Sequence, residues 1–178
     1  MKAYINGVGS ISAQHTSNSQ SFLNDIVYSE SNSLKAIEPD YKAFINPTLI
    51  RRMGRIIKMG VTAAQICLKD AGVEMPDAII TGTGLGCIED TEKFLTAIIE
   101  NKEQFLTPTS FIQSTHNTVG GQIALLLKCN NYNFTYVHRG FSFETCVLDA
   151  LMLLKDFHST SSAHPTHSSQ KKIHDAHK

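Results

Sequence analysis

The sequence lacks an excess of either charge. Sixteen basic residues balance sixteen acidic ones among 178 residues. A neutral balance without a local basic stripe gives no electrostatic reason to expect nucleic-acid binding. No apolar run reaches the length of a transmembrane helix, and the opening MKAYINGVGSIS lacks the apolar core of a signal peptide. We therefore expect neither nucleic acid nor a membrane among its partners, and a cytoplasmic protein.

Paired cysteines are also missing. Four cysteines occur singly, with no C-x-x-C motif: Cys67, Cys87, Cys129 and Cys146. This arrangement indicates neither a zinc site nor a disulfide framework. We expect four small, buried, apolar side chains in a reducing compartment.

The composition changes near the end of the sequence. With 42% hydrophobic and 18% charged residues, the chain can bury a core, and its length suits one domain. Residues 158–178 are instead polar and serine-rich, and they hold five of the eight histidines. Pairs such as His164 and His167 could share a transition metal, but no cysteine or carboxylate framework surrounds them. We predict a domain over 1–157, a disordered tail over 158–178, no metal and no cofactor.

Hydrophobic periodicity predicts alternating strands and helices. Strands are expected near 2–8, 78–82 and 132–138, and helices near 49–71, 89–101, 117–127 and 142–155, with a polar surface loop near 15–33 and an irregular or weakly helical segment over 108–117. The last two helices are apolar enough to be buried on most sides. This order predicts an α/β fold in which a mainly parallel sheet has helices on both faces.

The helix expected near 49–71 carries the most detailed signals. Asn46 and Pro47 suit its start and Gly72 suits its C-terminal cap. Gly54 and Gly60 inside it suggest close packing against a neighbour. Its apolar face should comprise Ile56, Met59, Ala63, Ile66 and Cys67.

Three motifs could take part in binding or catalysis or could serve only a structural role. The stretch TGTGLG, residues 81–86, could bring amides to an anion, but it lacks the spacing of a dinucleotide fingerprint and the Lys-Ser/Thr of a P-loop, so a tight turn is favoured. His116 and His138 could each act as a general base, although a lone histidine is usually a satisfied polar group. Ser142 could be a nucleophile, but the sequence supplies no partner that would activate it.

Five segments, in order, resemble the N-terminal half of a β-ketoacyl synthase of the thiolase-like superfamily. They are AYINGVGSIS, RRMGRIIKMGVTAAQICLKDAG, IITGTGLGCIEDTEKFL, TPTSFIQSTHNTVGGQIALLL and YNFTYVHRGFSFETCVLDALMLL. The resemblance covers about residues 1–155. It implies that the last segment is the strand, nucleophile turn and central helix of that family, and that TPTSFIQSTHN lines an acyl pocket.

Two departures from the family pattern bear on catalysis. Ungapped counting back from the central helix puts Gly140 at the position of the nucleophilic cysteine, within a turn of Arg139, Gly140, Phe141 and Ser142. Cys146 falls inside the helix, beyond the turn where the helix dipole favours a thiolate. The family's active-site histidines belong to a C-terminal half without counterpart in this sequence. We therefore expect no condensation by this chain alone.

The resemblance implies a role as a cysteine-less, chain length factor-like subunit. Such a subunit pairs with a catalytic β-ketoacyl synthase, and it would serve type II fatty-acid or polyketide synthesis of the aryl polyene or flexirubin type. A heterodimer with that enzyme or a homodimer, and an acyl carrier protein, are the expected partners. An acyltransferase or hydrolase that uses Ser142, a carrier-binding module and a truncated, non-functional remnant stay open as alternatives.

The same resemblance predicts an interface. The strand before the nucleophile turn, residues 133–138, should pair across a two-fold-like dimer axis, since soluble proteins avoid unpaired strand edges. Residues 109–117 should lie beside it, with Phe111 as a wall of the partner's acyl tunnel. The pocket and interface residues are expected to be Thr109, Phe111, His116, Asn117, Thr135, Val137 and His138.

Overall fold

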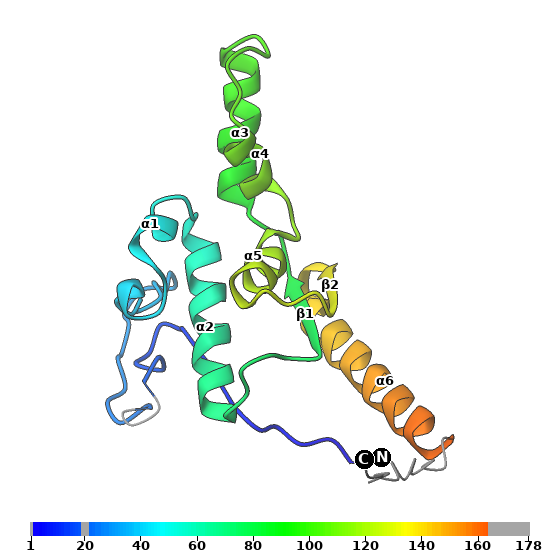
Figure 1. The fold of residues 1–178 in the computed structure, drawn as a ribbon. Coiled ribbons are helices and arrows are strands. Elements are labelled where there is room, and N and C mark those ends of the chain that lie inside the picture. Colours follow the sequence, from blue (N-terminus) through cyan, green and yellow to red (C-terminus); the bar gives the residue numbers. More distant parts are fainter. Residues whose placement is uncertain (1, 19–21, 164–178) are drawn as a thin grey trace, which may run out of the picture.

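A two-stranded parallel sheet lies at the centre of the fold (Figure 1). The computed structural model describes residues 2–18 and 22–163. Strand β1 (Ala78–Thr83) pairs with β2 (Tyr132–Val137) in a register that sets Ala78 beside Tyr132 and Thr83 beside Val137. Helices contact the sheet from both sides. The predicted α/β class and parallel sheet are confirmed.

Helices α5 (Thr118–Leu127) and α6 (Ser142–Ala163) cover opposite faces of the sheet. Successive strand residues point to alternate faces. A Cβ on Gly120 of α5 would meet the Thr81 and Asn133 side chains at 2.8 and 3.0 Å. A Cβ on Gly82, one residue further along β1, would instead meet Cys146 Sγ and the Ser142 carbonyl of α6, both at 2.8 Å. Both helices therefore lie very close to the sheet.

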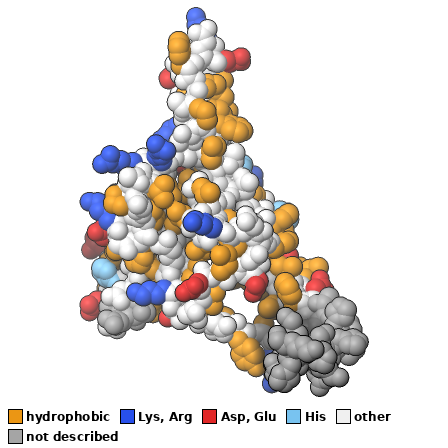
Figure 2. Space-filling model, viewed as in Figure 1, with side chains coloured by type: hydrophobic (Ala, Val, Ile, Leu, Met, Phe, Trp, Pro, Cys, Tyr) orange, Lys and Arg blue, Asp and Glu red, His pale blue; other side chains and the backbone are white. Residues whose placement is uncertain are grey.

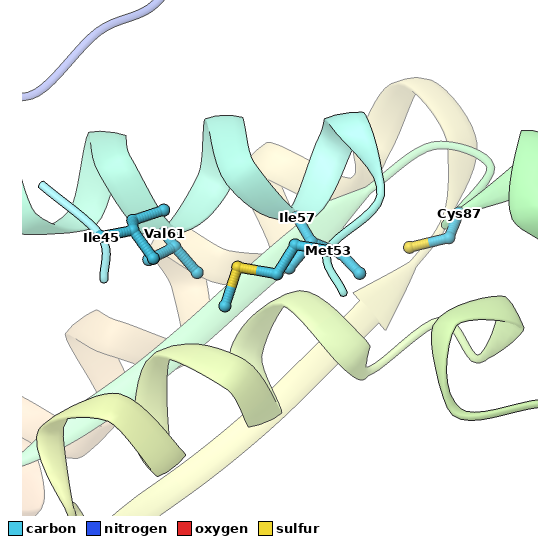
Figure 3. Close-up of a cluster of buried hydrophobic side chains, with 5 residues drawn as sticks. All are labelled: Ile45, Met53, Ile57, Val61 and Cys87. Atoms are coloured by element: carbon cyan, nitrogen blue, oxygen red, sulfur yellow. The ribbon is translucent and has the colours of Figure 1, made fainter. Parts of the chain in front are cut away.

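Helix α2 (Arg55–Ala71) packs on α5 and forms a further layer beyond it. The core cluster lies here, as Figure 3 shows, and comprises Ile45, Met53, Ile57, Val61 and Cys87. A side chain on Gly60 would strike Val119 of α5, so the predicted close packing at Gly60 is confirmed. The apolar face was predicted wrongly: Ile57, Val61 and Thr62 are buried, whereas Ile56 is exposed.

That error has a physical reason. The N-terminal segment crosses the other side of α2, where Gly7 and Gly9 lie against the backbone of residues 63, 67 and 71. Since α2 is contacted on two sides, periodicity alone does not show which apolar stripe meets the core.

The helix predicted near 49–71 is interrupted. Helix α1 (Pro47–Ile50) starts as expected, with the Asn46 side chain accepting from the Thr48 amide at 2.9 Å. The chain then turns, and α2 begins after Gly54, which is its N-cap and lies against the Asp90 carboxylate. The interpretation of Gly54 as a helix-interior residue was therefore wrong. Gly72 ends α2 with φ of +66°, as predicted.

The strand predicted near 2–8 is absent from the structure. This segment is extended, but it pairs with no described strand. The Val8 amide instead donates to Asp70 Oδ2 of α2 at 2.9 Å, and Cys67 Sγ contacts the Gly7 carbonyl at 3.3 Å. Alternation of residue types predicts an extended backbone, but only a neighbouring strand in register makes it part of a sheet.

Helices α3 (Ile88–Glu100) and α4 (Pro108–Ser114) pack together and project from the body (Figure 1). The segment 108–117 was expected to be irregular or weakly helical, and its first seven residues form α4, because Thr107 accepts from the Ser110 amide and Pro108 starts the helix. The short 3-10 helix η2 (Tyr41–Ala43) precedes α1, and the predicted surface loop holds no helix or strand in its described part.

At its far end, α6 continues to Ala163, beyond the boundary expected at 157. Residues 164–178, with the two histidine pairs, lie outside the described residues. Within the described residues, no helix combines the length and apolar character needed to cross a bilayer.

Candidate functional site

The candidate site lies at the carboxyl ends of β1 and β2. Two turns leave the sheet there: residues 84–87, which lead into α3, and residues 138–141, which lead into α6. In parallel α/β sheets, ligands and reacting groups gather at this edge. The two turns are neighbours, since a Cβ on Gly84 would lie 3.6 Å from the Arg139 carbonyl oxygen.

Ser142 joins these turns through its hydroxyl group. The side chain is almost fully buried, with 4% exposed. Its Oγ accepts the His138 amide proton at 2.8 Å, and its own proton is shared between the carbonyl oxygens of Thr83 at 2.7 Å and Arg139 at 2.9 Å. Ser142 therefore fixes the start of α6 against the end of β1. This geometry suits a structural tie between the turn and the strand better than an exposed nucleophile.

The turn itself is the short 3-10 helix η3 (Arg139–Phe141). Arg139 has φ of +50°, a left-handed conformation that is uncommon for residues other than glycine. Gly140 does not need such freedom, because its φ is not positive and an added Cβ would meet no atom within 4 Å. A side chain would fit at Gly140, so packing does not explain the glycine at this position, which the family resemblance predicts to be that of the nucleophile.

No cysteine stands at this turn. The Cys146 thiol lies one helical turn further along α6, against Gly82 of the sheet. Burial, and secondly the carboxylate of Asp149, raise its pKa above the ordinary value. Burial and Asp90 raise the pKa of the Cys87 thiol in the same way. Both thiols are therefore less ready to ionise, and so poorer nucleophiles, than a free cysteine.

The glycine turn after β1 is a tight turn, as favoured from the sequence. Gly86 has φ of +65°, and its amide donates to Thr83 Oγ1 at 2.9 Å. His116 packs over it, since a Cβ on Gly86 would lie 2.7 Å from the imidazole Cδ2. His116 and the other turn are thus brought to the same end of the sheet.

The other predicted pocket residues are divided between two places. Thr109 and Phe111 belong to α4, where the Phe111 ring packs on Phe94 of α3 with centroids 5.8 Å apart. Asn117 occupies the N-cap of α5 without a side-chain capping bond. Figure 1 shows α4 beside α3, projecting away from β2, so the prediction that residues 109–117 lie beside that strand is wrong for most of the segment.

Strand β2 presents a free edge within the described part of the chain. Val137 is its last residue, and Thr135 points toward α5 with a buried hydroxyl that has no partner among the described residues. Tyr132, Phe134 and Tyr136 stand in a row on the opposite face, with adjacent centroids 6.3 and 4.8 Å apart.

That aromatic row also contacts α6. The Tyr132 hydroxyl donates to Asp149 Oδ2 at 3.0 Å. The pKa values of both tyrosines are raised, first by burial and then through Asp149. Sequence reasoning missed this row, although the alternation in YNFTYV could have indicated it.

A hollow of about 120 Å³ borders the glycine turn, where it is lined by Gly86 and Cys87 and by the first turns of α2 and α3. No group of three or more potential metal ligands comes together among the described residues. A larger hollow, about 520 Å³, lies between α2 and the loops that precede it, lined by residues such as Phe44, Ile66 and Asp70. A smaller one of about 220 Å³ separates α4 from α1, α2 and α5.

Two similar solved structures identify the architecture as thiolase-like. A ketosynthase, ApeO, in complex with its chain length factor, ApeC, from Xenorhabdus doucetiae matches with a TM-score of 0.60 and 18% identity, over 84% of this chain and 63% of that one. The ishigamide ketosynthase/chain length factor matches with a TM-score of 0.59 and 18% identity, over 75% of this chain and 39% of that one. This chain thus spans less than two thirds of either neighbour.

The sequence itself places the chain in a family. The pattern described as "Beta-ketoacyl synthase, N-terminal domain" matches residues 27–160. The chain therefore belongs to the β-ketoacyl synthase N-terminal domain family. No curated protein matches it.

Proposed function

We propose that this chain is a non-catalytic, chain length factor-like subunit that pairs with a catalytic β-ketoacyl synthase. The observation that carries the proposal is the turn at residues 139–142. The Ser142 hydroxyl ties it to the end of β1, its backbone is held in the uncommon left-handed conformation at Arg139, and Gly140 has room for a side chain, yet no thiol is present. Covalent acyl transfer needs a nucleophile, so chemistry is left to a partner.

The free edge of β2 supports the pairing. Its unpaired amides and carbonyls would satisfy their hydrogen bonds with a partner strand. Both neighbouring structures contain a ketosynthase and a chain length factor. The pathway would be type II fatty-acid or polyketide synthesis in the cytoplasm, with an acyl carrier protein delivering the chain, as the family resemblance implies.

Two proline variants test the edge. Alternate residues of a strand direct their amides to opposite sides, so Phe134→Pro and Thr135→Pro each remove a donor, one toward β1 and one toward the free edge. The variant that loses the amide facing the free edge should keep the circular dichroism spectrum of the wild type. It should no longer co-purify with the full-length, cysteine-bearing ketosynthase encoded nearest to this chain. Equal recovery of the ketosynthase with the wild type and both folded variants would exclude this edge, and no recovery with the wild type would favour a non-functional remnant.

Covalent labelling tests the missing chemistry. Cerulenin or an acyl thioester should leave no adduct at residues 138–142 in intact-protein mass spectrometry. Gly140→Cys, which the open turn accommodates, is the positive control and should be labelled. A stoichiometric adduct on the wild type that disappears in Ser142→Ala would instead establish the acyltransferase or hydrolase alternative.

Phe111 offers a finer test of the acyl-tunnel role. Its ring is more than half exposed on α4, so a partner chain can reach it. If the ring forms part of a shared tunnel, Phe111→Arg should change the chain length of the partner's products while condensation continues. Unchanged products from a complex of normal stoichiometry would remove Phe111 from the tunnel wall.

A further inference from the structure

The hollow of about 220 Å³ at the junction of α1, α2, α4 and α5 is lined by residues from all four helices and from the turn between α1 and α2. In Figure 1 this junction has α1 and the start of α2 on one side and α4 and α5 on the other. Pockets for drug-sized ligands usually enclose about 300–1,000 Å³, so this hollow suits a smaller molecule. Among the described residues, none from the turns at 84–87 and 138–141 lines it, so it is separate from the candidate site.

Three polar side chains with unused hydrogen-bonding capacity line this hollow, and they are Arg52, Gln113 and Gln122. Within residues 2–18 and 22–157, neither ion pair includes Arg52, and neither glutamine amide makes a hydrogen bond. Arg52 is also the only charged residue among the described residues that line the hollow. The lining therefore carries one positive charge and no carboxylate that would neutralise it, which favours an anionic ligand.

The floor of the hollow is apolar. Met53 is 9% exposed and Ile57 is 1% exposed, and both belong to the core cluster. Ile112 of α4 adds a further apolar side chain to the lining. An anion that is polar on every side would leave this floor in contact with water. A ligand with an anionic end and a short apolar tail would instead cover it.

We propose that this hollow binds a small carboxylate with a short apolar tail. The planar guanidinium group of Arg52 can donate two parallel hydrogen bonds to a carboxylate. The amide groups of Gln113 and Gln122 supply further N–H donors for the same oxygens. The tail then lies over Ile57 and Ile112, out of water. The inference does not rest on the proposed function, because it uses neither the turn at 139–142 nor the edge of β2.

An NMR titration of the full chain with sodium butanoate tests the site. At constant ionic strength, saturable amide shifts should appear around residues 52–57, 112–113 and 122. A dissociation constant on the order of 1 mM is expected, because a ligand of so few atoms gains little binding free energy. Butanamide, the uncharged counterpart, should bind at least about tenfold more weakly, because it forms no charge-assisted pair with Arg52.

Two variants with matched controls show which residues hold the ligand. Arg52→Gln should weaken butanoate binding about tenfold or more, whereas Arg51→Gln, at the neighbouring arginine that does not line the hollow, should bind as the wild type does. Gln122→Glu adds a competing carboxylate to the lining and should abolish binding. Gln65→Glu, the same change on α2 outside this hollow, should have no effect. Circular dichroism of each variant separates lost binding from lost folding.

Four results would overturn the proposal. Absence of saturable shifts at tens of millimolar butanoate would show that the hollow binds no such ligand. Equal binding of butanamide would show that the charge is not recognised, and inorganic phosphate bound as tightly as butanoate would show that the apolar floor contributes nothing. Equal weakening by Arg51→Gln and Arg52→Gln would show attraction to the surface charge in general rather than binding in this hollow.

Discussion

The layer formed by α2 and α5 and the region formed by α6 and β2 differ in how completely their apolar side chains are buried. Ile57 of α2 is 1% exposed and lies in a closed cluster, whereas Leu148 of α6 is 59% exposed and Phe143 is 74% exposed. Figure 2 shows hydrophobic side chains at the surface of the projecting α3–α4 pair as well. The same kind of apolar sequence thus forms a finished core on one side of the molecule and open surfaces elsewhere. Large open apolar surfaces usually mark sites of interaction.

The largest expected effect separates these two regions by stability. Ile57→Ala should lower the free energy of unfolding by about 2–5 kcal/mol, because it leaves a cavity in a closed cluster. Leu148→Ala should cost the isolated chain less than about 1 kcal/mol, because most of its side chain is already in water. Urea unfolding measures the stability of both variants, at protein concentrations too low for the chain to associate. Equal losses would mean that α6 is covered even in a single chain.

A neighbouring pair of glycines sharpens the contrast within α5. Gly120→Ala should cost about 1–3 kcal/mol, because its Cβ would meet Thr81 and Asn133 at 2.8 and 3.0 Å. At Gly121 an added Cβ meets no atom within 4 Å, so Gly121→Ala should be neutral or stabilise by up to about 1 kcal/mol. Thermal unfolding of the two variants compares the sheet-facing and open sides of one helix. Equal destabilisation by both variants would contradict a position of α5 in which Gly120 faces the sheet and Gly121 faces away from it.

The smallest effect concerns a contact at the rim of the core. The Tyr41 hydroxyl and the Arg55 Nε–H each donate to Glu38 at 2.6 Å, and these bonds, Tyr41 first, lower the pKa of Glu38 below its ordinary value of 4.5. Since the folded-state pKa is lowered, the stabilisation is complete above pH 4.5 and is lost as the pH falls through the folded value.

Glu38→Gln tests this contact. The variant should be less stable than the wild type by under about 1 kcal/mol near pH 7, since the pair is partly exposed and screened. The difference should disappear as the pH falls through the lowered pKa of Glu38. Melting temperatures measured against pH check this, with Glu30→Gln in an exposed loop as the control. A difference that persists at low pH would show that the charge of Glu38 is not its cause.

Sequence reasoning found most elements but not all of their contacts. Strands β1 and β2 and helices α3, α5 and α6 begin within a residue of their predicted positions, because hydrophobic periodicity is a local signal. The N-terminal strand failed, since sheet pairing depends on a distant neighbour. The helix 142–155 was expected to be buried, but the described residues cover only its inner side, because apolarity does not specify what covers a helix.

The candidate site was likewise predictable from the sequence only in part. Counting along the sequence predicts the nucleophile position at Gly140 and stays a prediction, whereas the turn around it, residues 139–141, is seen in the structure. The bonds of Ser142 to Thr83 and Arg139 could not, because they join residues brought together only when β1 and β2 pair. The placement of Phe111 on Phe94, away from β2, likewise depends on the packing of α3 against α4.

The sequence by itself determined the α/β order of elements, the family and the missing thiol, because each is written in local pattern or residue identity. Only the tertiary structure decided that Gly140 is open, that the Ser142 hydroxyl joins the turn to β1, and that Ile57 rather than Ile56 faces the core. It also left the outer side of α6 and the edge of β2 uncovered within the described chain. Burial is a property of neighbours in space, and those neighbours are set by packing over long sequence distances.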